Sequence, residues 1–170
     1  MRKRSALLSL LFIVGFIGCS SVTVNSDFDP EANFPQYKTF DWMPYHAKPS
    51  ANPLMDKRIQ SAGERELSEK GYRKQTAGKP DFLIAYHTGV KDKIDVDPYG
   101  YRYGRYGRRW GTYTTVREYK QARLVIDFID APSKELFWRG WASGEVNNPE
   151  KAKEKIEEMT AKILAKYPPK

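Results

Sequence analysis

The sequence predicts an α+β domain of two layers, in which two amphipathic helices pack on one face of a mostly antiparallel sheet. Two segments carry apolar residues at helical spacing, and both begin with an Asn-Pro pair. Six other stretches have the alternation or the short apolar runs that are typical of strands. The expected order is β-β-α-β-β-β-β-α within residues 19–170, which are enough for one domain with its own core.

The first two strands are predicted to be short. Residues 21–28 alternate between apolar and polar, which indicates a strand with one buried face. A turn at residues 29–33 leads to a second strand at 37–42, which Pro44 closes.

Both helices are predicted from their ends as well as from their apolar spacing. The Asn-Pro pairs at 52–53 and 148–149 suit helix starts, because asparagine caps the free amides and proline fits the first helical position. Gly71 is a typical stop for the first helix, and the two prolines at 168–169 stop the second. Gly63 lies inside the first helix, and we expect it to mark close packing against the sheet.

Four strands are predicted between the helices. A short one begins at residues 72–74, and longer ones cover 82–96, then 112–119 with 122–130, then 135–146. The faces expected to point inward carry Phe82, Ile84, Tyr86, Thr88 and Val90, and Leu124, Ile126 and Phe128. In the last strand, alternation places Leu136, Trp138, Gly140 and Ala142 on one face, with Phe137 and Trp141 on the other. Apolar residues on both faces indicate a central strand.

The first 18 residues predict a lipoprotein signal peptide. A basic start at residues 2–4 precedes an apolar run at 6–17, and Gly18 stands before Cys19, the single cysteine of the chain. The apolar run is shorter than the roughly 18–20 residues that span a bilayer, so a transmembrane helix is the weaker alternative. An ordinary secretory signal with an incidental cysteine is the other alternative.

Lipidation of Cys19 would place the protein at a membrane. Its thiol takes a diacylglycerol, the signal is cut after Gly18, and the new amine receives a fatty acyl chain such as palmitate. Ser20 resembles the sorting pattern of outer-membrane lipoproteins, so we expect an outer-membrane lipoprotein that faces the periplasm. With one cysteine, no intramolecular disulfide is possible.

The charge of residues 19–170 is mildly basic, since Lys and Arg outnumber Asp and Glu by 26 to 21. This excess suits contact with anionic surfaces and is too small to indicate nucleic acid. The sharpest compositional feature is a Gly/Tyr/Arg segment at 98–111, predicted to be a loop. Its aromatic rings could stack on sugars, and its arginines could bind phosphates or carboxylates. The candidate contacts are Tyr99, Arg102, Tyr103, Arg105, Tyr106, Arg108, Arg109 and Trp110. A plain hairpin tip is the competing interpretation.

Catalytic signals are weak. The two histidines, His46 and His87, show no metal-ligand spacing, and we expect His87 to be an ordinary, partly buried residue. The acidic residues at predicted strand ends, Asp81, Asp127, Asp130 and Glu135, are expected to cap or solvate turns. There is no nucleophile elbow and no phosphate-binding loop. We therefore predict no metal, no cofactor and no enzyme activity.

Several motifs in order resemble the bacterial lipoproteins with the DUF4136 domain, a family without a characterised function. They are FPQYKTFDW at 34–42, NPL at 52–54, EKGY at 69–72, PDFLIAYH at 80–87, a Gly/aromatic loop, LVID at 124–127, FWRGWA at 137–142 and YPP at 167–169. The resemblance covers nearly all of residues 20–170. It implies the location and the fold, and it supplies no catalytic residues. The arginine-rich loop departs from the glycine and bulky aromatic residues that the family pattern implies.

The leading functional hypothesis is a lipid-anchored, non-catalytic binding or scaffolding domain of the cell envelope. Its partners would be the membrane, through Cys19, and an anionic envelope glycan, a lipid headgroup or another envelope protein. Two alternatives remain at this point. One is an envelope hydrolase that uses carboxylates at strand ends, and the other is a structural subunit of an outer-membrane assembly.

Overall fold

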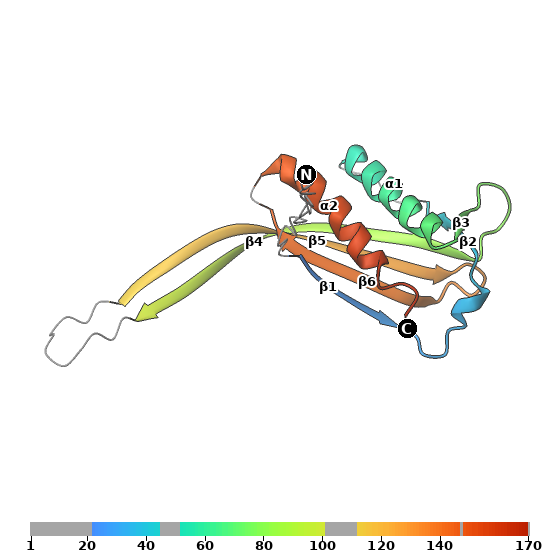
Figure 1. The fold of residues 1–170 in the computed structure, drawn as a ribbon, viewed down its shortest axis with the longest axis horizontal. Coiled ribbons are helices and arrows are strands. Elements are labelled where there is room, and N and C mark those ends of the chain that lie inside the picture. The colour runs from blue at the N-terminus through green and yellow to red at the C-terminus, as the bar shows by residue number, and fades with distance from the viewer. Residues whose placement is uncertain (1–21, 45–51, 101–111, 147, 170) are drawn as a thin grey trace, which may run out of the picture.

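The computed structural model describes residues 22–44, 52–100, 112–146 and 148–169 of the 170-residue chain. Its elements are β1 (Val22–Phe28), the short 3-10 helix η1 (Phe34–Gln36), β2 (Thr39–Trp42), α1 (Pro53–Glu69), β3 (Arg73–Lys74), β4 (Phe82–Gly100), β5 (Thr112–Asp130), β6 (Leu136–Glu145) and α2 (Pro149–Leu164). The predicted order of strands and helices is confirmed, and the α+β class with it (Figure 1).

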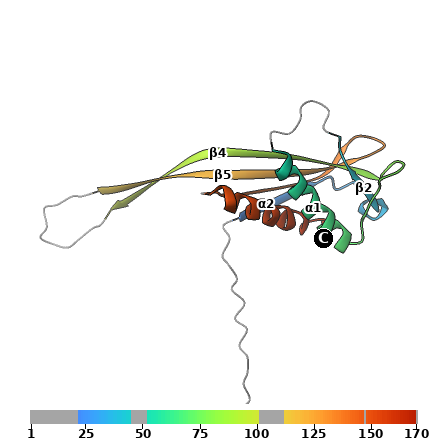
Figure 2. The same ribbon diagram turned by 90° about the horizontal axis from the view of Figure 1, so that it is seen from above.

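The strands form one sheet in the spatial order β1-β6-β5-β4-β2-β3. Pairing is antiparallel from β1 through β4, while β2 is parallel to both β4 and β3. β6 lies between β1 and β5, so its expected position inside the sheet is confirmed. Both helices lie on one side of this sheet (Figure 2) and pack against each other.

The core lies between the helices and the sheet. Side chains from β4, β5 and β6 meet residues of α1 and α2 there, and aromatic rings make many of the contacts. The inward residues predicted for β5, Leu124, Ile126 and Phe128, are all buried. In β4, Phe82 and Ile84 are buried, whereas Thr88 and Val90 are exposed because they lie where the strand leaves the part of the sheet that the helices cover.

The predicted ends of α1 are confirmed by hydrogen bonds. The side chain of Asn52 accepts a hydrogen bond from the amide of Met55 at 3.1 Å. At the other end, Gly71 has a φ of 88°, and the amide of Tyr72 donates to the carbonyl of Leu67. This left-handed turn is the usual glycine stop of a helix.

Gly63 marks close packing, as predicted. A Cβ atom at this position would lie 3.0 Å from the indole ring of Trp42 on β2. The absence of a side chain therefore lets α1 approach the sheet closely at β2.

The predicted faces of β6 are wrong at its start. Alternation places Phe137 opposite Trp138, yet both are buried, and Leu136 is exposed instead. The cause is an irregularity in the ladder, because Trp138 pairs with Phe128 while Leu136 pairs with Ile129, which leaves Phe137 as an extra residue. A bulge of this kind turns two successive side chains toward the core.

β4 and β5 leave the sheet together and project far to one side of the body (Figure 1). Each has 19 residues, and β6 accompanies β5 only as far as Gln121. We call the nine pairs from Asp92–Lys120 to Gly100–Thr112 the ribbon. At ~3.4 Å per residue the ribbon is about 30 Å long.

The ribbon corrects one predicted boundary. Residues 98–100 were expected in the loop, but the structure includes them in β4, with Tyr99 paired to Tyr113. Pro98 is compatible with this position, because proline is tolerated in edge strands and both strands of a free ribbon are edges.

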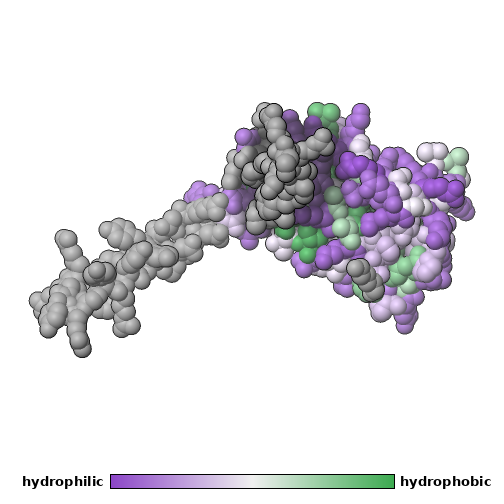
Figure 3. Space-filling view, in the orientation of Figure 1, coloured by the Kyte–Doolittle hydropathy of each residue, from purple (hydrophilic) through white to green (hydrophobic). Residues whose placement is uncertain are grey.

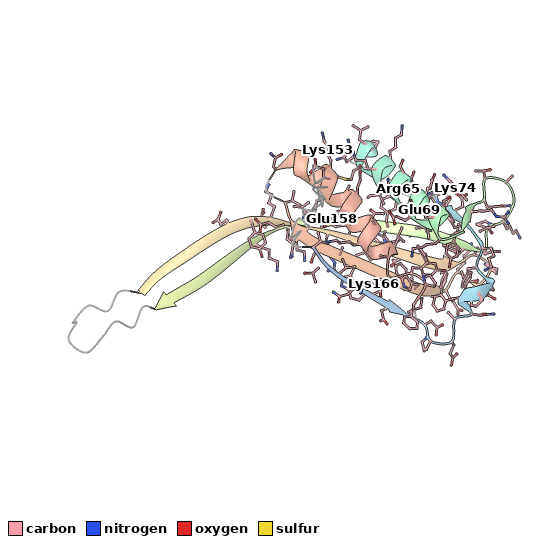
Figure 4. All side chains as sticks on the ribbon, in the orientation of Figure 1. Arg65, Glu69, Lys74, Lys153, Glu158 and Lys166 are labelled. Atoms are coloured by element: carbon pink, nitrogen blue, oxygen red, sulfur yellow. The ribbon has the colours of Figure 1, made fainter. Side chains whose placement is uncertain are left out.

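The side of the molecule that carries the helices is mainly hydrophilic (Figure 3). Charged side chains cover the helices there, among them Arg65, Glu69, Lys153 and Glu158 (Figure 4). Several of them form ion pairs within this layer, such as Lys162 with Glu158 at 2.8 Å. No helix in the described part of the chain is long and apolar enough to cross a membrane.

Candidate functional site

The face of the sheet turned away from the helices is covered by no other element among those that the structure describes (Figure 2). We call it the open face. Because side chains alternate along a strand, the residues that stand between the core residues in the sequence of each strand point toward the open face. Two adjacent rows across β4, β5, β6 and β1 lie at its centre. They are Ala85, Asp127, Arg139 and Asp27, and then His87, Val125, Trp141 and Asn25.

Asp127 and Arg139 form a rigid pair in the first row. The Nε and Nη2 atoms of Arg139 donate to the two carboxylate oxygens of Asp127 at 2.6 and 2.7 Å. Asp127 is buried, whereas 47% of the Arg139 side chain is exposed. The hydrogen bonds from Arg139 to Asp127 raise the pKa of Arg139 above its ordinary value, so its charge is fixed.

His87 lies beside this pair and differs from the expectation. Its side chain is 71% exposed, with Nε2 at 3.9 Å from Oδ2 of Asp127, so it is not a partly buried core residue. The reason is its position on the open face, where no helix covers it. Asp127, too, is not the strand-end cap that we expected, because it lies within β5 and holds Arg139.

Two shallow depressions hollow the open face. One, of about 450 Å³, is lined by Trp141, Arg139, Arg123, Asp27, Phe28 and Leu136, among others, and we call it the Trp141 depression. The other, of about 420 Å³, is lined by His87, Lys91, Lys93, Gln121 and Arg123 together with small and apolar neighbours, and we call it the basic depression. Arg123 lines both, so the two are neighbours on the open face.

The basic depression has a one-sided charge. Lys91, Lys93 and Arg123 are exposed, and no carboxylate occurs among the described residues that line it. Lys93 also lines a further hollow at the base of the ribbon, together with Lys120, Asp92 and Glu118. From Lys91 to Lys120, basic residues outnumber acidic ones by eight to four. Most of the net charge of residues 19–170 therefore falls within residues 91–120 of the sequence, where four of the arginines lie in 101–111, outside the described residues.

The remaining strand-end carboxylates have structural partners. Asp81 accepts hydrogen bonds from the amides of Lys38 and Thr39 at 2.8 and 2.7 Å. Burial raises the pKa of Asp81, but these bonds and the Thr39 hydroxyl outweigh it, so the pKa lies below its ordinary value. The hydrogen bonds between Asp81 and Thr39 thus fasten β2 to the start of β4.

Asp130 closes the turn between β5 and β6. It accepts from the amide of Ser133 at 2.7 Å and from the hydroxyl of Tyr37 at 3.1 Å. Burial, and then the carboxylate of Asp130, raise the pKa of Tyr37, so its hydroxyl stays a donor. The capping expectation is confirmed for Asp81 and Asp130. Within the described ranges, no three His, Cys, Asp or Glu side chains are grouped to hold a metal ion.

The structure does not test the predicted lipidation site or most of the predicted loop contacts. Cys19, His46 and residues 101–111 lie outside the described residues, and of the candidate contacts only Tyr99 falls on a described backbone. Sequence reasoning missed Lys91, Lys93, Arg123, Arg139 and Trp141 as a group. The signal was present, because the alternation that makes Leu124 and Ile126 inward residues places Arg123 on the opposite face.

Comparisons with known proteins concern the domain as a whole. A family model described as "Domain of unknown function (DUF4136)" matches residues 24–169. A PDZ domain protein from Parabacteroides distasonis ATCC 8503 is similar in structure, with a TM-score of 0.62 and 17% identity. The match covers 88% of this chain and 36% of that protein, so this chain spans well under half of its length. The PelC dodecamer from Paraburkholderia phytofirmans matches with a TM-score of 0.47 and 15% identity, over 85% of this chain and 95% of that one. No curated protein was found to match.

Proposed function

The chain belongs to the DUF4136 family, a domain of unknown function. We therefore propose a function on the basis of the residues on the open face of the sheet. The protein is a lipid-anchored, non-catalytic domain of the cell envelope. It binds an anionic component of the envelope through the basic depression and the base of the ribbon. Its location is the outer membrane, on the periplasmic side.

The observation that carries the proposal is the separation of charge between the two sides of the sheet. On the helix side, lysines such as Lys74 and Lys162 are paired with glutamates at 2.6 and 2.8 Å. In the basic depression, Lys91, Lys93 and Arg123 converge, and none of the described residues that line it is a carboxylate. Clustered charge of one sign attracts a ligand of the opposite sign and raises its local concentration.

The register of the sheet supports an orientation toward the membrane. Val22, the first residue of β1, is in the same row as Gly144, Ala122 and Val90, at the base of the ribbon. Cys19 precedes Val22 by three residues, so the two Cα atoms can be at most about 11 Å apart. A lipid on Cys19 would hold the ribbon end of the domain close to the membrane surface, where anionic envelope material is dense.

The test compares two triple variants with the same change in charge. The variant K91Q/K93Q/R123Q alters the basic depression, and K57Q/K153Q/K166Q alters exposed lysines on the helix side. The full chain in detergent micelles is titrated with fluorescent polyphosphate, which offers charge alone. We expect the first variant to bind about tenfold more weakly and the control within about twofold of the parent. The difference should shrink as salt rises, and equal weakening by both variants would refute the site.

A second candidate function, a structural subunit of an envelope assembly, is favoured by one observation. Phe28 and Leu136 are 42% and 45% exposed, and both line the Trp141 depression. Exposed apolar side chains around a hollow are typical of protein contacts. Crosslinking in intact cells would favour this function if one protein partner were captured by the parent and lost in a Phe28→Ser/Leu136→Ser variant.

A further inference from the structure

We infer that the Trp141 depression and the basic depression together form a binding site for an anionic polysaccharide. The inference rests on the proposed function and narrows it, because it names the ligand as a sugar chain and assigns a role to each depression. The Trp141 depression binds a sugar ring, and the basic depression binds the acidic groups of the neighbouring sugars.

The Trp141 depression combines the features that sugar rings require. Trp141 is partly exposed on the open face and lines the hollow with the apolar residue Leu136. An aromatic face packs against the C–H face of a sugar, while hydroxyls need planar hydrogen-bonding groups beside it. The carboxylate of Asp27 accepts such bonds, and the guanidinium groups of Arg123 and Arg139 donate them.

Arg139 is held in position for this task. Its bidentate pair with the buried Asp127 uses two of the five N–H groups of the guanidinium, and the half-exposed remainder faces the hollow. Arg139 is two residues from Trp141 on β6, which places it about 7 Å along the same strand face. Because the guanidinium of Arg139 is already oriented beside the aromatic ring, it loses little conformational entropy when a ligand binds.

The charges explain why the ligand is acidic but is not a simple phosphate. Within the Trp141 depression, Arg123 and Arg139 are offset by Asp27 and Asp29, so charge alone gives this hollow little attraction for anions. The excess positive charge begins at Arg123 and continues through Lys91 and Lys93. A chain that crosses from one hollow to the other therefore meets hydrogen-bonding groups first and cations next, which suits a sugar polymer with acidic substituents.

The test uses three soluble probes of similar length with the full chain in detergent micelles. They are hexagalacturonate, which has sugar and charge, hexapolyphosphate, which has charge alone, and maltohexaose, which has sugar alone. We expect hexagalacturonate to bind most tightly. Trp141→Ala should weaken hexagalacturonate about tenfold and leave polyphosphate within about twofold, whereas Arg123→Gln should weaken both. Trp141→Tyr keeps an aromatic face and should retain most of the affinity.

Each outcome separates the inference from the proposed function. Unchanged hexagalacturonate affinity in both Trp141→Ala and Trp141→Tyr overturns the sugar site, even if polyphosphate binding still depends on Arg123. Equal binding of the two anionic probes by the parent overturns it as well. If the parent binds no anionic probe, the proposed function fails with it. Should Trp141→Ala not fold, as judged by its melting curve, the hexagalacturonate affinity of Asp27→Ala decides, and an unchanged affinity in that variant refutes the inference.

Discussion

Alanine substitution at Phe137 tests the bulge in β6 directly, because strict alternation and the structure give opposite results. Phe137 is 3% exposed, stacks on Tyr37 with ring centroids 4.1 Å apart, and meets Phe82 edge-on at 5.8 Å. Burial of an aromatic side chain removes about 150–250 Å² from water, which at ~25 cal/mol per Å² is about 4–6 kcal/mol. Because alanine retains part of that area, we expect Phe137→Ala to lower the free energy of unfolding by about 3–5 kcal/mol.

Leu136→Ala is the matched control. Leu136 is 45% exposed, so its truncation should cost less than about 1 kcal/mol. In a domain of this size each kcal/mol corresponds to about 2–4 °C in Tm, so Phe137→Ala should melt roughly 10 °C below Leu136→Ala. Calorimetry or urea unfolding of both variants measures the difference. A larger loss for Leu136→Ala than for Phe137→Ala would show that β6 alternates regularly and that the bulge is wrong.

Two further predictions concern a carboxylate and the anchor. Asp81→Asn should cost about 1–2 kcal/mol at neutral pH, because the amides of Lys38 and Thr39 lose a charged acceptor. The folded-state pKa of Asp81 lies below its ordinary value, so this stabilisation is present above about pH 4 and disappears as the pH falls through the folded-state pKa. Urea unfolding of parent and variant across pH should therefore converge in acid, and a constant gap would contradict the assignment. Cys19→Ser should leave an unprocessed precursor that incorporates no labelled fatty acid, and normal labelling would exclude the lipoprotein signal.

Local patterns were sufficient for the elements and their order. The caps at Asn52 and Gly71 predicted both ends of α1, because a cap acts on backbone groups within a few residues of itself. Gly63 also predicted a close approach to the sheet, although the sequence did not show that Trp42 lies there. These features depend on residues that are neighbours along the chain, so a single sequence is enough to predict them.

The candidate site depended on information from distant segments. Arg123 and Lys93 lie thirty residues apart, and they converge because β4 and β5 pair antiparallel with one register. Arg139 reaches Asp127 across adjacent strands, and the exposure of Arg139 depends on which face the helices leave open.

The sequence by itself determined that two helices and six strands form, in which order, and where the first helix begins and ends. Only the tertiary structure decided that β6 has a bulge, that β4 and β5 extend together beyond the sheet, and that His87 is exposed. The physical reason is the range of the interactions. Capping and periodicity are local, whereas strand register and the choice of the covered face follow from the packing of the whole core.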